Sequence, residues 1–273
     1  MNALAEISIH QRSAGVASAA FTRAGDRTRI SDLRQEGSAK AIVLQDQANN
    51  AAEVVFLNTS GGLTGGDRLS YALQLGPGIE MTATTQTAER VYRSLGSHAQ
   101  IDVMLDVAAG AHLDWIPQET ILFDRAAACR RTQIHLARDA TCLMVETLVL
   151  GRAAMGEVLH ELAFRDMREI TRDGQPVHLE AVMFDPARLR TGAAGLDGAR
   201  VIATIVLVAP NAADKLGVIR DVLDCPQTQA GASALEGRLV IRLMAADAWP
   251  LRMQLCRILG VLREKPMPRV WQM

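Results

Sequence analysis

The chain has 273 residues, of which 49% are hydrophobic and 22% are charged, a balance typical of a globular protein with a sizeable buried core. Its formal net charge of −1 and its aromatic content of 4% provide neither the electrostatic field nor the stacking surface that nucleic-acid binding requires. No apolar run approaches the roughly 18 residues of a membrane-spanning helix, and the four cysteines include no CxxC pair, so we expect a cytoplasmic protein that binds neither nucleic acid nor membrane.

The first distinctive segment is "NTSGGLTGGDRL" at 58–69, between predicted strands at 53–58 and 68–75. It does not fit a phosphate-binding loop, because Asp67 and Arg68 stand where that motif requires lysine and a hydroxyl. The GxGxxG and GxSxG patterns of dinucleotide sites and nucleophile elbows are also absent. Two interpretations stay open: a bulged hairpin in which Asp67 bonds the N–H groups of its own turn, or a turn that presents the Asp67 carboxylate for function.

The region from 69 to about 150 is predicted to be a succession of strands. Apolar residues alternate with polar ones in "LSYALQL" at 69–75 and again in "IDVMLDV" at 101–107, the period of a half-buried strand. Turns are expected at Gly78, Gly110, Asp139 and Gly174, which are 32, 29 and 35 residues apart. This approximate repeat favours stacked, solenoid-like β-layers, although a sandwich of ordinary hairpins would show nearly the same pattern.

Helical periodicity appears only near the C-terminus. Residues 210–226 predict one helix with Asn211 as its N-cap, and residues 249–266 predict a second with Pro250 in its first turn. The segment "GRLVIRLMAAD" between them predicts a strand. We therefore expect one mostly β domain over 1–273, with two helices near its C-terminus.

Five stretches of the sequence, taken in order, resemble one family. "NTSGGLTGGDRL" is similar to the signature of the D-type urease accessory proteins (UreD, called UreH in some bacteria). "TTQTAERVYRS" at 84–94, "HLDWIPQETILFDRA" at 112–126, "ETLVLGRAAMGE" at 146–157 and "PRVW" at 268–271 resemble further family segments in the same order. The match runs from 58 to 271, almost the whole chain.

The resemblance implies an assembly factor that is not itself an enzyme. Members of the family bind apo-urease together with a helical partner of the UreF type and a GTPase of the UreG type. The complex delivers nickel to the buried, carbamylated-lysine site of urease. The family fold is mostly β, layered in a helical fashion, with two helices, which agrees with the elements predicted above.

The resemblance also implies roles for individual residues. The aspartate after the paired glycines, here Asp67, is expected to line or support an internal passage for nickel, which suits a metal that must be bound weakly and released. The other signature residues are assigned to partner binding or to the family structure: Asn58, Gly61, Gly62, Gly65, Gly66, Arg68, Tyr92, Arg93, Arg152, Arg269 and Trp271. For Arg269 and Trp271, docking of the tail onto its own domain is the alternative to partner binding.

Two further carboxylates lie in apolar strands. Glu146 in "TCLMVETLVLG" either forms an ion pair, with Arg152 as the nearest candidate by sequence, or lines a polar channel, because an unpaired buried charge is very costly. Glu180 in "PVHLEAVMF" is interpreted in the same way. The six histidines include no HxH or HxxxH pair, so we expect no tightly bound cofactor and at most a transient Ni²⁺.

Two functions from other classes remain as alternatives to urease maturation. One is a β-layered hydrolase or lyase that pairs Asp67 with Glu146 or Glu180, although few aromatic residues are present to bind a sugar. The other is a metal-storage protein, which the absence of ligand clusters in the sequence disfavours.

Overall fold

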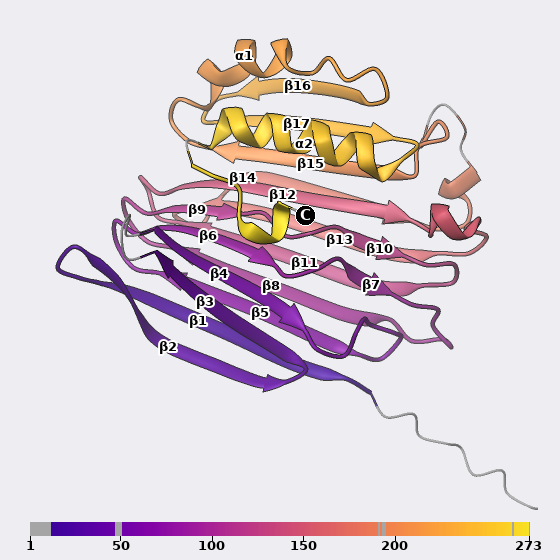
Figure 1. Cartoon of the computed structure of the whole chain (residues 1–273), viewed down its shortest axis with the longest axis horizontal. Helices are drawn as coiled ribbons and strands as arrows, with labels where there is room; N and C mark the ends of the chain where they lie inside the picture. Colours follow the sequence, from indigo (N-terminus) through magenta and orange to yellow (C-terminus); the bar gives the residue numbers. More distant parts are fainter. Residues whose placement is uncertain (1–11, 47–50, 191, 193–194, 264, 273) are drawn as a thin grey trace, which may run out of the picture.

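The computed structural model describes residues 12–46, 51–190, 192, 195–263 and 265–272. Within these residues, two β-sheets of seven and ten strands face each other. The strands are stacked in chain order, from the N-terminal strands at one end to the C-terminal strands and helices at the other (Figure 1).

The centre of each sheet is a parallel ladder. In the seven-stranded sheet the ladder consists of β5 (Arg68–Leu75), β8 (Ala99–Val107), β11 (Ala127–Leu136) and β13 (Ala163–Arg172). In the ten-stranded sheet it consists of β4 (Ala51–Asn58), β6 (Glu80–Thr85), β9 (His112–Trp115) and β12 (Thr141–Leu150). The turns at Gly78, Gly110 and Asp139 carry the chain from the first sheet to the second. The layered, solenoid-like fold is therefore confirmed, and the sandwich of hairpins is wrong.

Two connections differ from the predicted pattern. The turn at Gly174 closes a hairpin within one sheet, because β13 pairs antiparallel with β14 (Gln175–Phe184). Asp173 and Gly174 have φ of 47° and 76°, which suits the tight turn of a two-residue hairpin. The glycine-rich segment does not form the predicted bulged hairpin, since β4 and β5 belong to opposite sheets.

Antiparallel strands complete both ends of the stack. At the N-terminal end, β1 (Ala14–Ala24) continues the parallel ladder beside β5 and pairs antiparallel with β2 (Arg27–Gly37), and β3 (Ala39–Asp46) pairs antiparallel with β4. The C-terminal end of the ten-stranded sheet consists of β15 (Val201–Val208), β17 (Arg238–Ala245) and β16 (Gln229–Leu235). Two short strands, β7 (Glu89–Val91) and β10 (Thr120–Leu122), lie in the connections that return to the seven-stranded sheet.

The main core lies between the two sheets, where inward side chains alternate with outward ones. In β8, for example, Ile101, Val103 and Leu105 are buried while the residues between them are exposed. The strand β12 is buried on both faces. Its residues Cys142, Met144 and Leu148 belong to the core between the sheets, whereas Leu143 and Val145 pack in a second core beneath the C-terminal helix. This explains why β12 is a nearly continuous apolar run in sequence.

Two α-helices lie near the C-terminus, as predicted. The first, α1 (Leu216–Asp221), is shorter than expected, and Asn211 makes no side-chain capping bond; a 3₁₀ turn at Ala212–Lys215 precedes it. The second, α2 (Ala248–Leu262), begins after Asp247, whose side chain accepts a hydrogen bond from the Trp249 N–H. It covers β15 and β17 (Figure 1). No helix in the described part of the chain is long and apolar enough to cross a membrane.

Candidate functional site

The glycine-rich loop between β4 and β5 packs tightly against residues 90–98. The Leu63 N–H donates to the Arg90 carbonyl at 2.7 Å, and the Tyr92 N–H donates to the Leu63 carbonyl at 2.7 Å. A Cβ at Gly62 would lie 2.3 Å from the Tyr92 ring, and a Cβ at Gly65 would lie 2.1 Å from the Ser94 hydroxyl. Glycine is therefore required at Gly62 and Gly65 because another segment approaches too closely for a side chain.

Asp67 is buried and anchors this loop. One carboxylate oxygen accepts a hydrogen bond from the Thr64 N–H at 2.8 Å, and the other accepts one from the Ser13 N–H at 2.8 Å. The Arg68 N–H donates to the Ser13 carbonyl at 2.9 Å, while the Arg68 side chain is exposed. The carboxylate thus ties the loop to the start of β1, and its proposed role on a nickel path stays a prediction.

A cavity of about 70 Å³ lies between the two sheets beside this loop. Its outer end is lined by the exposed residues Gly61, Thr87 and Arg90. Its inner end is lined by buried Trp115 and Glu146 together with Arg130. The cavity therefore leads from the surface to charged groups in the core, and its lining includes neither Asp67 nor Glu180.

Glu146 lies at the inner end of the cavity, on the face of β12 that points between the sheets. Its carboxylate is 2.8 Å from the Arg130 guanidinium and accepts a hydrogen bond from the Trp115 indole N–H at 3.0 Å. The predicted partner, Arg152, pairs instead with Glu157 at 2.9 Å. The sequence neighbour was the wrong choice because Arg152 lies beyond the end of β12, on the surface, while Arg130 faces Glu146 from the opposite sheet.

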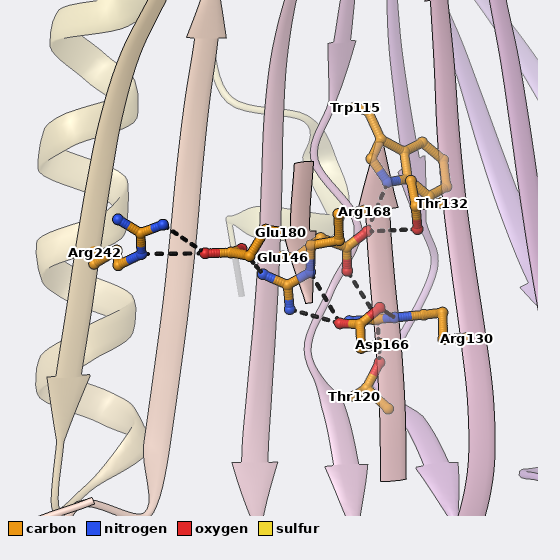
Figure 2. Close-up of polar contacts among 9 residues, drawn as sticks. All are labelled: Trp115, Thr120, Arg130, Thr132, Glu146, Asp166, Arg168, Glu180 and Arg242. Atoms are coloured by element: carbon orange, nitrogen blue, oxygen red, sulfur yellow. Dashed lines mark hydrogen bonds and ion pairs between the residues drawn. The ribbon is translucent and has the colours of Figure 1, made fainter. Parts of the chain in front are cut away.

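The pair of Glu146 and Arg130 begins a chain of alternating charges (Figure 2). Asp166 bridges Arg130 and Arg168, with carboxylate-to-guanidinium distances of 2.5 and 2.6 Å. Arg168 also contacts Glu180 at 2.8 Å, and Glu180 contacts Arg242 at 2.9 Å. The chain thus leads from buried Glu146 to Arg242, whose side chain is 63% exposed.

Burial and charge compete within this ionic network. Burial alone would raise the pKa of Asp166, but Arg130 and Arg168 hold it below its ordinary value. Burial likewise opposes ionisation of Glu180, and Arg168 and Arg242 overcome that effect, so the pKa of Glu180 is lowered. Asp166 and Glu180 are therefore ionised, and each carboxylate of the network lies beside a guanidinium.

Strand register explains how the network is assembled. Leu69, Ile101, Arg130 and Asp166 are aligned on neighbouring strands β5, β8, β11 and β13, and all four are buried. This inward column is apolar on the first two strands and charged on the next two. The sequence does indicate this position, although it was missed. Arg130, Thr132, Ile134 and Leu136 occupy every second position of β11, so Arg130 lies on the same inward face as the other three.

Glu89 in β7 is a second cavity carboxylate that sequence reasoning did not identify. Its two oxygens accept long hydrogen bonds of 3.3 Å from the Asn58 side-chain amide, and one accepts the Arg90 N–H at 3.2 Å. Burial raises the pKa of Glu89 to about 7, against the opposing effect of these hydrogen bonds. The Asn58 carbonyl oxygen in turn accepts from Ser60, so Asn58 links Glu89 to the glycine-rich loop.

Three of the signature residues form one cluster at the surface. Tyr92 donates its hydroxyl to the Gly61 carbonyl at 3.1 Å and meets Phe123 edge to face, with ring centroids 4.8 Å apart. The Arg152 guanidinium lies over the Phe123 ring, 4.5 Å from its centroid. Arg93 lines the same shallow pocket. The structure therefore brings Tyr92, Arg93 and Arg152 together, while Glu180 lies apart from them.

The C-terminal segment docks onto its own domain. Buried Trp271 donates its indole N–H to the Ile116 carbonyl at 3.0 Å, and the Arg252 guanidinium lies 4.7 Å from the Trp271 ring centroid. Arg263 forms a buried ion pair with Asp114 at 2.8 Å. Arg269 is exposed. Of the two tail residues, Trp271 therefore docks onto its own domain, whereas Arg269 is accessible to a partner.

Across the described residues, no group of three or more His, Cys, Asp or Glu side chains comes together in a way that could hold a metal ion. Asp67, Glu146 and Glu180, the residues predicted for a nickel path, are not assembled into one site. Glu146 and Glu180 are instead the carboxylates of the ionic network, and Asp67 is a loop anchor.

Comparison with known proteins identifies the family. A family model described as UreD urease accessory protein matches residues 13–272. A protein from Cereibacter sphaeroides, "Urease accessory protein UreD", is 54% identical over 264 residues, covering 96% of each chain. Proteins of the same name from Paracoccus denitrificans and Rhizobium leguminosarum are 49% and 41% identical, covering 96% and 90% of this chain and 93% and 90% of their own. The chain therefore belongs to the UreD family of urease accessory proteins.

Proposed function

We propose that this protein is a scaffold for urease maturation, which binds apo-urease and accessory proteins of the UreF and UreG types in the cytoplasm. The match to the UreD family over residues 13–272 carries the proposal. In this role the protein does no bond-breaking chemistry itself, and GTP hydrolysis by the UreG-type partner drives delivery of nickel to the urease active site.

The interior of the fold supports a polar route for nickel. The cavity beside the glycine-rich loop connects exposed Thr87 and Arg90 with buried Glu146, and two carboxylates line it. Oxygen ligands that are few and partly neutralised bind Ni²⁺ weakly enough to release it. The cavity therefore forms one section of a proposed internal passage.

The surface cluster of Tyr92, Arg93 and Arg152 supports a partner-binding role. Tyrosine and arginine are enriched at protein interfaces, and both Tyr92 and Arg152 are exposed. The cluster adjoins the glycine-rich loop through the contact of Tyr92 with Gly61. We assign this face to docking of an accessory protein.

Retention of partners in a pull-down tests the scaffold role. The tagged protein, co-expressed with apo-urease and the UreF-type and UreG-type proteins, should retain apo-urease and the UreF-type protein. Replacing Arg152 with Glu should weaken retention, whereas the same change at Arg131, which is exposed on the outer face of β11, should not. Failure to retain either protein would contradict the proposal.

The alternative of a hydrolase or lyase that pairs Asp67 with Glu146 or Glu180 has no support in the geometry. Both oxygens of Asp67 accept backbone N–H groups, and Glu146 and Glu180 are each paired with arginine. An acid and base pair needs two carboxylates facing one substrate space, and the cavity that contains Glu146 is lined by neither of the other two.

A further inference from the structure

Exposed arginine side chains border the glycine-rich loop. Arg12 lies against the loop, since a Cβ at Gly66 would be 3.1 Å from its Nε atom. The backbone carbonyls of Arg90 and Arg93 accept hydrogen bonds from the loop at 2.7 and 2.8 Å. Arg68 is the first residue of β5, directly after the loop. These four residues, all exposed, form what we call the arginine patch.

The guanidiniums of the arginine patch have no partners. None of the four forms an ion pair or a side-chain hydrogen bond with another residue in the part of the chain that the structure describes. Arg90 is adjacent to Glu89, but Glu89 lines the cavity and bonds Asn58 instead. The buried arginines are different, since Arg130 and Arg168 are both held by carboxylates. One solvated arginine is common on a surface, but four around one loop leave a positive charge uncompensated.

Carboxylates close to the arginine patch are already used by the fold. Both oxygens of Asp67 accept backbone N–H groups. Asp124 and Glu157 line the same shallow pocket as Arg93. One oxygen of Asp124 accepts two backbone N–H groups, at 2.6 and 3.1 Å, and Glu157 is ion-paired with Arg152. These carboxylates therefore hold the loops in place and do not pair with the arginine patch.

The chemistry of the arginine patch favours a partner that supplies carboxylates. A guanidinium is planar, and its N–H groups match the two oxygens of a carboxylate. Tyr92, which is 38% exposed, lies beside the patch and adds the kind of aromatic contact that is enriched at protein interfaces. A nucleic acid would also supply anions, but its bases need several stacking surfaces, and Tyr92 is a single aromatic side chain. An acidic protein surface is therefore the better match.

We propose that the arginine patch binds an acidic segment of the accessory protein that docks on this face. This inference rests on the proposed function and names the chemistry of the partner surface, which is a group of closely spaced Asp and Glu side chains. Complementary charges of this kind steer the partner to the correct face and raise its association rate, and salt weakens the effect.

Association kinetics of the purified full-length protein with the purified UreF-type protein test the proposal. In biolayer interferometry at about 50 mM NaCl, Arg90→Glu combined with Arg93→Glu should lower the association rate constant at least about tenfold. Lysine at both positions should retain most of the rate. The matched control combines Arg131→Glu with Arg138→Glu, which changes the net charge equally at exposed positions away from the loop, and it should bind like the wild type.

Salt provides a second measurement that needs no folded variant. Raising NaCl to about 500 mM should slow association of the wild type strongly. Equal association rate constants at the two salt concentrations, or for the wild type and the Arg90→Glu, Arg93→Glu variant, would overturn the proposal. Binding of a poly-dT oligonucleotide that is lost in this variant would assign the patch to nucleic acid and would also overturn it.

The outcomes separate this inference from the proposed function. If the wild type does not bind the UreF-type protein at all, both the scaffold and the docking role of the arginine patch are refuted. If the wild type and the charge-reversed variant bind the UreF-type protein equally well, the scaffold stands and only the role of the arginine patch is refuted.

Discussion

Replacing Arg130 with Met should destabilise the protein strongly. The Arg130 side chain is 6% exposed and contacts Glu146 at 2.8 Å, Asp166 at 2.5 Å and the Thr120 hydroxyl at 3.0 Å. Removing one partner of a buried ion pair costs about 3–5 kcal/mol, because a buried charge is left uncompensated. Asp166 keeps Arg168, so the loss falls mainly on Glu146, and we expect a cost near the lower limit, about 3 kcal/mol.

The matched control makes the same substitution at an exposed ion pair. Arg257 in α2 lies 2.7 Å from Asp224, with both side chains about half exposed. Exposed pairs of this kind contribute about 0–1 kcal/mol, so Arg257→Met should change stability by less than about 1 kcal/mol. Urea unfolding followed by tryptophan fluorescence gives both values. If Arg130→Met costs no more than Arg257→Met, the network does not compensate Glu146 in the way described.

Three further predictions concern the loop and the cavity. Gly65→Ala places a Cβ 2.1 Å from the Ser94 hydroxyl and should lower stability by about 1–3 kcal/mol in thermal unfolding. The control Gly217→Ala adds a Cβ that meets nothing within 4 Å and should not lower stability. Equal melting temperatures for the two variants would contradict this prediction. Asp67→Ala removes two hydrogen bonds to backbone N–H groups, so it should lower the free energy of unfolding by about 2 kcal/mol and speed proteolysis in the glycine-rich loop. An unchanged cleavage rate would argue against Asp67 as the anchor of that loop. The pKa of Glu89 is raised from 4.5 to about 7 on folding, so the wild type should lose about 3 kcal/mol of stability between pH 4 and pH 8. Glu89→Gln should not show this loss. Parallel curves of the free energy of unfolding against pH for the two proteins would refute the prediction.

Local alternation was sufficient to predict the strands but not their partners. The patterns at 69–75 and 101–107 correspond to β5 and β8, and the apolar stripe of residues 249–266 corresponds to α2. Whether consecutive strands form hairpins or pass between two sheets depends on contacts about 30 residues apart along the chain. The turns at Gly110 and Gly174 show the difference, since the first crosses between sheets and the second closes a hairpin.

The candidate site was less accessible to sequence reasoning. Glu146 was identified because a carboxylate in an apolar strand needs a partner, but Arg130 faces it from another sheet and no local pattern joins them. Glu89 was missed because one charged residue in a short polar strand has no distinguishing pattern. Its significance comes from burial, from Asn58 and from the cavity, all of which exist only after folding.

The nickel content of urease measures the proposed maturation role of this chain. Cells that express the urease subunits with the UreF-type and UreG-type proteins are compared with and without this chain, and nickel per active site is measured in purified urease by plasma mass spectrometry. We expect nearly full nickel occupancy when the chain is present and little nickel when it is omitted. Equal nickel occupancy in the two preparations would show that this chain has no role in nickel delivery.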